Sequence, residues 1–269
     1  VGGVVRDLLL HRHHEDPWRG LPDLDLVVEG RAADLVQRLP DALEREFGCS
    51  IPLNVQEHGA FGTFELELDL PVECGGTWLL DVASARQETY PVPAENPTVS
   101  LGSLRDDLAR RDFTVNAMAL VVGVGPAEPE LLDLHGGQDD LAARRLNFLH
   151  GGSVQDDPTR VVRGARLAAR LGFRFAEEVP RLLAPALLPE VVAGASRSRL
   201  REELLLTLEE EAFYRALALL AELGALKALY GLDLPPEAPF LRLRAEEGLG
   251  EARLLLLLFH LHLITSLNI

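Results

Sequence analysis

The sequence predicts an α+β N-terminal part followed by an all-α part. Before about residue 140, short segments with a strand-like hydrophobic pattern are separated by turns. After that point leucine, alanine, glutamate and arginine dominate with helical periodicity. With 269 residues, 47% of them hydrophobic, the chain is long enough to bury a sizeable core in two or more units.

The individual elements follow from the same patterns. The predicted strands are residues 25–28, 62–70, 78–83 and 117–122. The predicted helices are residues 159–171, 198–208 and 211–229. Residues 90–101 are predicted as a loop, because their prolines lack N–H donors and fix φ. Residues 254–264 are apolar but too short to span a bilayer, so we expect a buried helix there.

The chain opens with Gly2 and Gly3, ahead of an apolar segment typical of a helix start. Glycine lets the backbone approach a ligand closely, and the N–H groups at a helix start bind anions. Asp23 and Asp25 follow on a predicted strand, where residues two apart point to the same side. Two close carboxylates favour a cation, and magnesium combines carboxylates with phosphate oxygens. The pattern predicts a site for a magnesium-bound nucleoside triphosphate; the alternative is an ordinary turn and an ordinary alternating strand.

Cysteine and histidine residues indicate no further metal site. Cys49 and Cys74 lie far apart in no ligand spacing, which favours core thiols in a reducing compartment. His11, His13 and His14 stand among charged residues in a predicted loop over residues 10–21, and we do not expect them to bind metal. The sequence carries no signal peptide pattern, and we expect residues before Val1 to be missing.

The formal net charge of −16 argues against a general nucleic-acid binder. Between Arg160 and Arg201, however, nine arginines stand against three glutamates. Arg160, Arg163, Arg166 and Arg170 fall within an arc of about 120° on a helix, which suits a phosphate backbone. The alternative is a solvated helix face.

Residues 106–117 place charges of both signs before an apolar segment. Arg111 can donate to a phosphate or sugar as a rigid fork, and Asp112 can accept from ribose hydroxyls. The alternative is a surface ion pair, because a lone Arg-Arg-Asp run is usually no more than that.

A second charged cluster opens the predicted helix at residue 159. Asp157 suits the N-cap position, with Pro158 as the first helical residue. Asp157 and Arg160 are three apart, so they share a face and present an acceptor beside a donor fork. Cytosine and adenine show an exocyclic amine next to a ring nitrogen, whereas uracil and guanine show the reverse order. Such an edge favours C and A, since a wrong base leaves polar groups unpaired.

Seven runs occur in the order seen in one family: GGVVRD, DLD, LDVASARQETY, LARRDFTVNAMAL, LLDLHGGQDDL, DDPTRVVRGARLAARLGF and SRSRLREELL. Over most of residues 1–230 the chain resembles the bacterial (class II) tRNA nucleotidyltransferases and poly(A) polymerases, most of all a CCA-adding enzyme. The resemblance implies a polymerase-beta-like catalytic head with a mixed sheet at residues 1–142. It implies a helical neck for base recognition at residues 143–208 and an incomplete, tRNA-binding helical body at residues 209–269.

The resemblance also implies roles for single residues. Asp23 and Asp25 would be the catalytic residues and hold two magnesium ions. The nucleotide would bind to Gly2, Gly3, Arg6, Asp7, Arg111, Asp112, Asp157 and Arg160. The residues that would support these catalytic and nucleotide-binding side chains are Asp81, Arg110, Asn116 and Arg163. The tRNA would bind to Arg166, Arg170, Arg199 and Arg201.

The implied activity is a transferase that adds C and A to the 3′ end of tRNA from CTP and ATP, in the cytoplasm, with no membrane and no evident protein partner. Residues 86–104 have the full length seen in CCA-adding and A-adding relatives. This length favours complete CCA addition or A addition over the addition of CC alone. The chain lacks the Gly-Arg-Arg-Phe-like element of the poly(A) polymerases. Asp156, immediately before Asp157, stands where members of the family usually have a glutamate. A nucleotidyltransferase for small molecules and a catalytically inactive RNA-binding relative are the alternatives from other classes.

Overall fold

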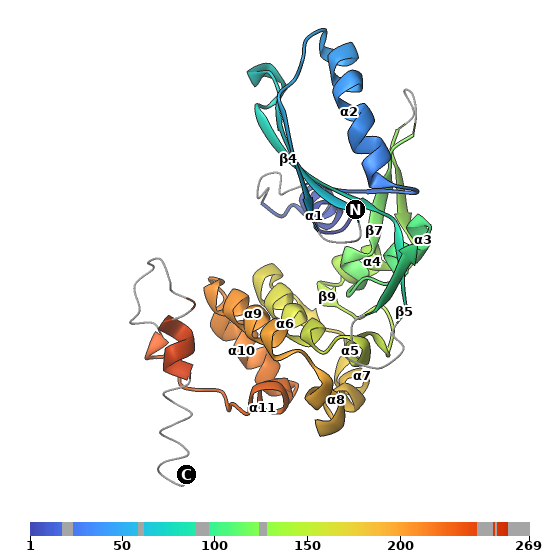
Figure 1. Ribbon diagram of the computed structural model, residues 1–269. Helices are drawn as coiled ribbons and strands as arrows, with labels where there is room; N and C mark the ends of the chain where they lie inside the picture. Colours follow the sequence, from blue (N-terminus) through green and yellow to red (C-terminus); the bar gives the residue numbers. More distant parts are fainter. Residues whose placement is uncertain are drawn as a thin grey trace. The chain divides into compact units, whose positions relative to one another are not determined.

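The computed structural model describes residues 1–17, 24–58, 62–89, 97–123, 128–240, 250 and 252–257. The chain divides into two compact units (Figure 1). The first unit comprises Val1–Thr89 and Pro97–Ala142, and the second comprises Tyr90–Asn96 and Ala143–Ile269. Each unit is described by itself below.

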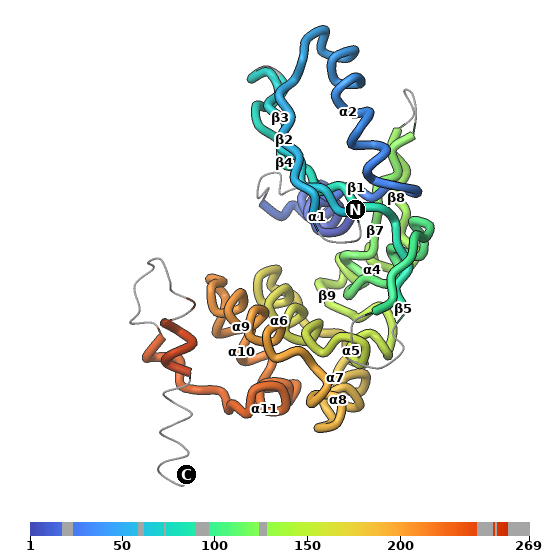
Figure 2. The backbone as a smooth tube through the Cα atoms, viewed as in Figure 1, coloured from blue at the N-terminus to red at the C-terminus, as the bar shows by residue number. Residues whose placement is uncertain are grey.

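The first unit is built on a mixed four-stranded sheet in the order β1-β4-β3-β2 (Figure 2). Strand β1 (Leu24–Val28) is parallel to β4 (Thr77–Ser84), and β3 (Thr63–Asp69) is antiparallel to both β4 and β2 (Leu53–His58). Strands β1, β3 and β4 confirm three of the predicted segments. The edge strand β2 was not predicted, because nearly all its residues are exposed and its sequence lacks a clear alternation.

One face of this sheet is covered by helix α2 (Ala32–Phe47) (Figure 1). Phe64, Leu66 and Leu68 of β3 alternate along the strand and form the core beneath the helix, together with Val82 of β4. The intervening residues point to the opposite face, so the same alternation that builds the core leaves a polar face on the other side of the sheet.

The remainder of the first unit surrounds this sheet with short elements. The helices are α1 (Gly3–His14), α3 (Leu104–Ala109) and α4 (Gly137–Ala142), with 3-10 turns at Val72–Cys74 and Thr114–Asn116. The strand pairs are β5 (Arg86–Thr89) with β6 (Thr98–Leu101) and β7 (Met118–Val121) with β8 (Glu130–Asp133).

Two local predictions in this unit were wrong. Residues 98–101 were predicted as loop but form β6, because they follow the last proline of the segment and keep the N–H donors that pair with β5. His11, His13 and His14 form the last turn of α1 rather than a loop, since basic side chains are favourable at a helix C-terminus.

The second unit is almost entirely helical, which confirms the predicted α+β part followed by a helical part. Its helices are α5 (Ser153–Asp156), α6 (Thr159–Leu171), α7 (Val179–Leu183), α8 (Pro189–Gly194), α9 (Arg197–Glu209), α10 (Phe213–Glu222) and α11 (Ala225–Tyr230), with a 3-10 turn at Ala184–Leu187. Two-residue strands β9 (Arg145–Leu146) and β10 (Arg174–Phe175) form a parallel pair.

Helix α6 packs against both α9 and α10 and forms the centre of this unit. Val161 and Ala165 of α6, Leu208 of α9 and Leu217 of α10 are fully buried there. The single helix predicted over residues 211–229 is wrong, because it consists of α10 and α11. Gly224 adopts φ +71°, a left-handed conformation that ends one helix before the next begins.

Both cysteines are free and exposed, so the expectation of core thiols was wrong. Cys49 follows the glycine that caps α2, and Cys74 lies in a turn, where neither can reach the core. Of the apolar segment 254–264, residues 254–257 are helical with Leu255 67% exposed and Leu257 buried, and residues 258–264 lie outside the described part. Within the described ranges no helix combines the length and the hydrophobicity needed to cross a membrane.

Candidate functional site

The polar face of the sheet carries a row of acidic residues. Because β1 and β4 are parallel, Asp25 is in register with Asp81, and Glu65 of β3 is opposite Asp81. Residues in register on neighbouring strands point to the same face, about 4.8 Å apart. Leu24 and Leu26 flank Asp25 and point to the opposite face. The structure therefore places Asp81, predicted as a supporting acid, directly beside Asp25, whereas Asp23 lies outside the described residues.

Gly2 lies at the centre of this constellation. It precedes α1 with φ +73°, and its N–H donates to the Met118 carbonyl at 3.1 Å. A Cβ atom on Gly2 would stand 2.8 Å from Arg111 Nη1 and 3.3 Å from Asp25 Oδ2. Three segments far apart in the sequence thus bring a glycine turn, a guanidinium and a carboxylate together, and only glycine leaves room between the two charged groups.

Arg6 and Asp7 form an internal network rather than an open fork. Arg6 is buried, and its Nε and Nη2 donate to Asp7 Oδ1 and Oδ2 at 2.8 and 3.0 Å. Arg6 Nη1 donates to Asn116 Oδ1 at 2.6 Å, and Asn116 Nδ2 donates to Asp112 Oδ1 at 3.2 Å. Asp112 also accepts from the Phe113 N–H at 2.9 Å. These side chains join α1 to the segment that carries Arg111.

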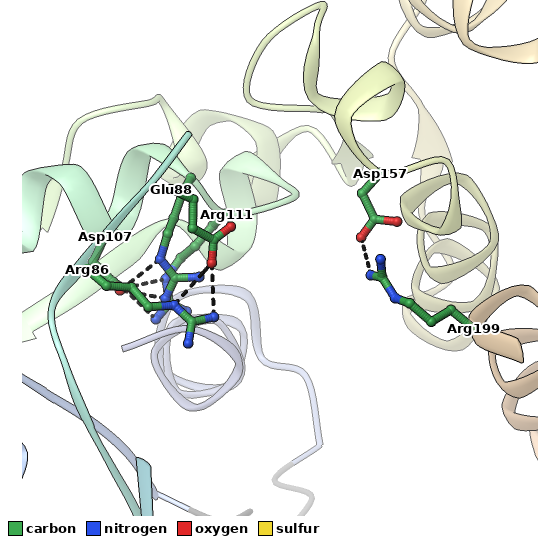
Figure 3. Close-up of polar contacts among 7 residues, drawn as sticks. Arg86, Glu88, Asp107, Arg111, Asp157 and Arg199 are labelled. Atoms are coloured by element: carbon green, nitrogen blue, oxygen red, sulfur yellow. Dashed lines mark hydrogen bonds and ion pairs between the residues drawn. The ribbon is translucent and has the colours of Figure 1, made fainter. Parts of the chain in front are cut away.

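A buried acid that sequence reasoning did not single out holds both arginines of this segment. Asp107 is fully buried; its Oδ1 accepts from Arg110 Nε and Nη2 at 3.0 and 2.6 Å, and its Oδ2 accepts from Arg111 Nε and Nη2 at 3.3 and 3.1 Å. Arg110 Nη1 also donates to Glu88 of β5 at 3.0 Å, and Glu88 accepts from Arg86 Nε at 3.0 Å. We call these five residues the Asp107 cluster (Figure 3).

The interpretation of residues 106–117 as a surface ion pair was therefore wrong, because the carboxylate is buried. The signal was present in the sequence: Asp107 stands three and four residues before the two arginines, a spacing that brings side chains together on a helix. Ser103 also begins α3 with a capping box to Asp106, which fixes the helix start and hence the face that carries Asp107.

In the second unit, Asp157 is buried, and both of its carboxylate oxygens accept hydrogen bonds. Its Oδ1 accepts from the Thr159 N–H at 3.1 Å and the Thr159 hydroxyl at 2.6 Å, and its Oδ2 accepts from Arg199 Nη2 at 2.5 Å (Figure 3). Burial alone would raise the pKa of Asp157, but the hydrogen bond from Thr159 and the charge of Arg199 outweigh it and hold that pKa below its usual range. Asp157 is an ionised acceptor at neutral pH.

The helix start at Asp157 differs from the prediction by one residue. Asp157 caps the first turn through the Thr159 N–H, but Pro158 precedes the helix instead of opening it, because α6 begins at Thr159. Arg160, predicted beside Asp157, is 6% exposed, and its Nη1 donates to the Ser153 hydroxyl of α5.

The arginine stripe of α6 faces acids of α9 and the residue that follows it. Glu203 pairs with Arg163 at 3.0 Å and with Arg166 at 3.2 Å, and Glu210 pairs with Arg170 at 3.6 Å. The stripe is thus neither a simple solvated face nor an unopposed row of positive charge. Of the four arginines predicted to bind tRNA, Arg166 and Arg170 lie in these pairs, Arg199 lies at Asp157 and Arg201 is exposed.

The carboxylates of Asp25 and Asp81 have the oxygen chemistry that magnesium prefers. Within the described ranges, no group of three or more histidine, cysteine, aspartate or glutamate residues is arranged to hold a metal ion. Magnesium characteristically uses one or two carboxylates and completes its shell with water and phosphate oxygens, so the donor set at Asp25 fits that ion.

Comparisons with protein families, with related sequences and with solved structures agree with one another. Residues 1–147 match the family described as the Poly A polymerase head domain. An A-adding tRNA nucleotidyltransferase of Aquifex aeolicus is 39% identical over 219 residues, 81% of this chain and 24% of the relative. A CC-adding tRNA nucleotidyltransferase of Deinococcus radiodurans is 41% identical over 235 residues, 87% of this chain and 56% of the relative.

Among solved structures, the apo form II of a CCA-adding enzyme matches with a TM-score of 0.73 and 34% identity. The match covers 89% of this chain and 52% of the solved chain. The chain thus spans about half, or less, of the proteins it is similar to.

Proposed function

Because the chain belongs to the Poly A polymerase head domain family, we propose that it is a tRNA nucleotidyltransferase that adds C and A residues to the 3′ end of tRNA from CTP and ATP. The observation that carries the proposal is the convergence at Gly2. A turn with no side chain is flanked by a guanidinium, which suits an anion, and by a carboxylate, which suits a cation. A magnesium-bound triphosphate has both requirements at once.

In the first unit, the residues of this constellation would bind the nucleotide. The Gly2 turn and the N–H groups at the start of α1 would receive the triphosphate, with Gly3 allowing the close approach. Arg6 and Asp7 would keep that turn in place through their pairing with each other and with Asn116. Arg111 would donate to the phosphate or sugar, and Asp112 would accept from the ribose.

Asp23 and Asp25 would hold magnesium, with Asp81 beside them. Bound magnesium supplies charge neutralisation at the phosphates and a lowered pKa for the attacking hydroxyl. The terminal hydroxyl of the RNA then attacks the α-phosphorus in line, a phosphodiester bond forms, and pyrophosphate leaves. The protein would contribute position rather than a covalent nucleophile, so the geometry around Gly2 would determine the rate.

In the second unit, Asp157 and Arg160 would read the base. Asp157 remains ionised because Arg199 and Thr159 stabilise its charged form, so it can accept from the exocyclic amine of C or A. Arg160 supplies donors for the neighbouring ring nitrogen, and U and G present these groups in reverse. Arg163 would support this arrangement through Glu203.

The RNA would be held largely by shape and backbone contacts in residues 143–208 and 209–269, with residues 1–142 as the catalytic part. Since Arg166 and Arg170 are paired with acids, exposed Arg201 is better suited to a phosphate contact. We expect tRNA affinity to fall steeply as salt increases. With a tRNA-processing role, we expect the protein to act in the cytoplasm.

The test uses magnesium, labelled CTP or ATP, and three tRNA transcripts that end before CCA, after C and after CC. Extension of all three to CCA supports the proposal in full. Extension of only the CC-ended transcript by one A identifies an A-adding enzyme, and addition that stops after CC identifies a CC-adding enzyme. Runs of A on any RNA would indicate a poly(A) polymerase, and RNA binding without any magnesium-dependent product would contradict the enzymatic proposal.

A further inference from the structure

We propose that Asp107 is a positioning residue for nucleotide binding, which acts by fixing the orientation of the Arg111 guanidinium. The inference rests on the proposed function in one respect only, because it takes a nucleotide as the ligand. It does not depend on the identity of the RNA or on which nucleotides are added.

The argument begins with the two contacts that Asp107 makes to Arg111. Nε and Nη2, which lie on one edge of the planar guanidinium, both donate to Asp107 Oδ2, at 3.3 and 3.1 Å. Two contacts from one edge to a single oxygen fix which edge of the guanidinium faces Asp107. The remaining nitrogen, Nη1, donates to the Asn116 carbonyl at 3.5 Å and lies on the Gly2 side, where a Cβ atom would stand only 2.8 Å from it. Asp107 thus determines which edge of Arg111 faces the glycine turn.

Burial makes this orientation rigid. The Asp107 side chain is 0% exposed and that of Arg111 is 18% exposed. A buried carboxylate without its donors is costly, so the four hydrogen bonds from Arg110 and Arg111 are maintained together. Glu88, 7% exposed, holds Arg110 from strand β5 and prevents it from moving away.

Arg111 is the member of the Asp107 cluster that an anion beside Gly2 would meet. The cluster contains three guanidinium groups and two carboxylates, and the Asp25 carboxylate lies beside Arg111 at Gly2. Glu88 is shared by Arg86 and Arg110, and Asp107 is shared by Arg110 and Arg111. Because Asp107 holds the Nε and Nη2 edge of Arg111, Nη1 faces Gly2, where a polyphosphate would gain a charge-assisted hydrogen bond at a preset position.

The first experiment measures the binding of ATP with magnesium, without tRNA, by isothermal titration calorimetry. Asp107→Asn is expected to weaken ATP binding roughly tenfold, the amount for loss of one well-placed charge-assisted hydrogen bond. The matched control is Asp106→Asn, the same substitution on the adjacent residue, whose exposed side chain only caps α3. ATP binding by this control is expected to be unchanged.

A double-mutant cycle then separates positioning from a general structural role. If Asp107 acts through Arg111, Asp107→Asn has no further effect on ATP binding in a chain that already carries Arg111→Gln. An equal loss in both backgrounds overturns the inference, as does unchanged binding in the single variant. Thermal melting of each variant shows that a folded protein is compared.

Should Asp107→Asn fail to fold, Asp107→Glu keeps the charge and moves the carboxylate by one methylene group. Weaker ATP binding by this variant supports positioning, and unaltered binding contradicts it. A native chain that binds ATP but extends no tRNA would defeat the proposed function and leave the cycle to decide the role of Asp107. A native chain that binds no ATP would overturn the inference itself.

Discussion

The two units use carboxylates and arginines in different ways. In the first unit, Asp107 and Glu88 hold three arginines, and one of these, Arg111, lies beside Gly2 and Asp25. In the second unit, Glu203 and Glu210 pair with arginines of a neighbouring helix, and the charge holds α6 to α9. One network ends in a guanidinium beside Gly2, whereas the other joins two helices.

Residues of a ligand site and residues that only hold helices together, which we call scaffold residues, should respond differently to mutation. Removal of a site residue should abolish activity with little change in stability, because such groups are kept for their chemistry rather than their packing. Removal of a scaffold residue should lower stability and affect activity only indirectly. The predictions below test that contrast, and their expected effects decrease from one to the next.

Asp25→Asn should have the largest effect. Loss of a magnesium ligand is expected to lower nucleotide addition on the order of a thousandfold, since a bound metal contributes several kcal/mol of transition-state stabilisation. The melting temperature should change by less than about 4 °C. Single-turnover extension of tRNA and thermal melting measure the two effects. Asp41→Asn, an exposed residue of α2, is the control, and equal loss of activity in both variants would remove Asp25 from the site.

Glu203→Gln should lower the stability of the second unit, because Glu203 joins α9 to α6. It breaks the ion pairs with Arg163 and Arg166, and we expect the free energy of unfolding to fall by about 2 kcal/mol, as for loss of a largely buried charged partner. Urea denaturation gives the value. Glu202→Gln, the exposed neighbouring residue, should cost little. Equal stability of the two variants would show that the arginine stripe does not hold the helices together.

Arg199→Gln sharpens the comparison, because Arg199 joins a scaffold helix to a proposed base-reading residue. Without it, Asp157 loses one of its fixed partners, and the preference for CTP over UTP is expected to fall about tenfold. Arg201→Gln, two residues along the same helix and exposed, is the control. Competition between labelled CTP and UTP measures the ratio. A preference lost equally in both variants would point to RNA binding instead of base reading.

The smallest effect should be a pH dependence of the second unit. The pKa of Asp157 is lowered in the folded chain, against burial, by Thr159 and Arg199, so its ionised form stabilises the fold above its unfolded pKa of about 4. That contribution is lost as the pH falls below 4 through the folded pKa. In urea denaturation, the native chain should exceed Asp157→Asn in stability at pH 7, and the gap should narrow toward pH 3. A constant gap would exclude ionisation of Asp157 as the cause.

Much of the fold was determined by local sequence. Period-two alternation is enough to define β1, β3 and β4, and helical periodicity defines α6 with its bounds at Thr159–Leu171. The residue types that meet at Gly2 also followed from spacing, since Gly2, Asp25 and Arg111 were each predicted to face a ligand. Period patterns fail for β2 and β6, whose pairing depends on a neighbouring strand rather than on their own alternation.

Which charges pair was decided only by the tertiary structure. The sequence shows nine arginines between Arg160 and Arg201, but it does not show that Arg163 pairs with Glu203, 40 residues further along. In the first unit, Arg110 and Glu88 are likewise 22 residues apart. A periodic pattern reports which face a side chain occupies and not what stands opposite it. The register between β1 and β4 places Asp81 beside Asp25. Asp107 is buried, and there it holds Arg111 instead of forming a surface ion pair. Register and burial both arise only when distant segments pack together.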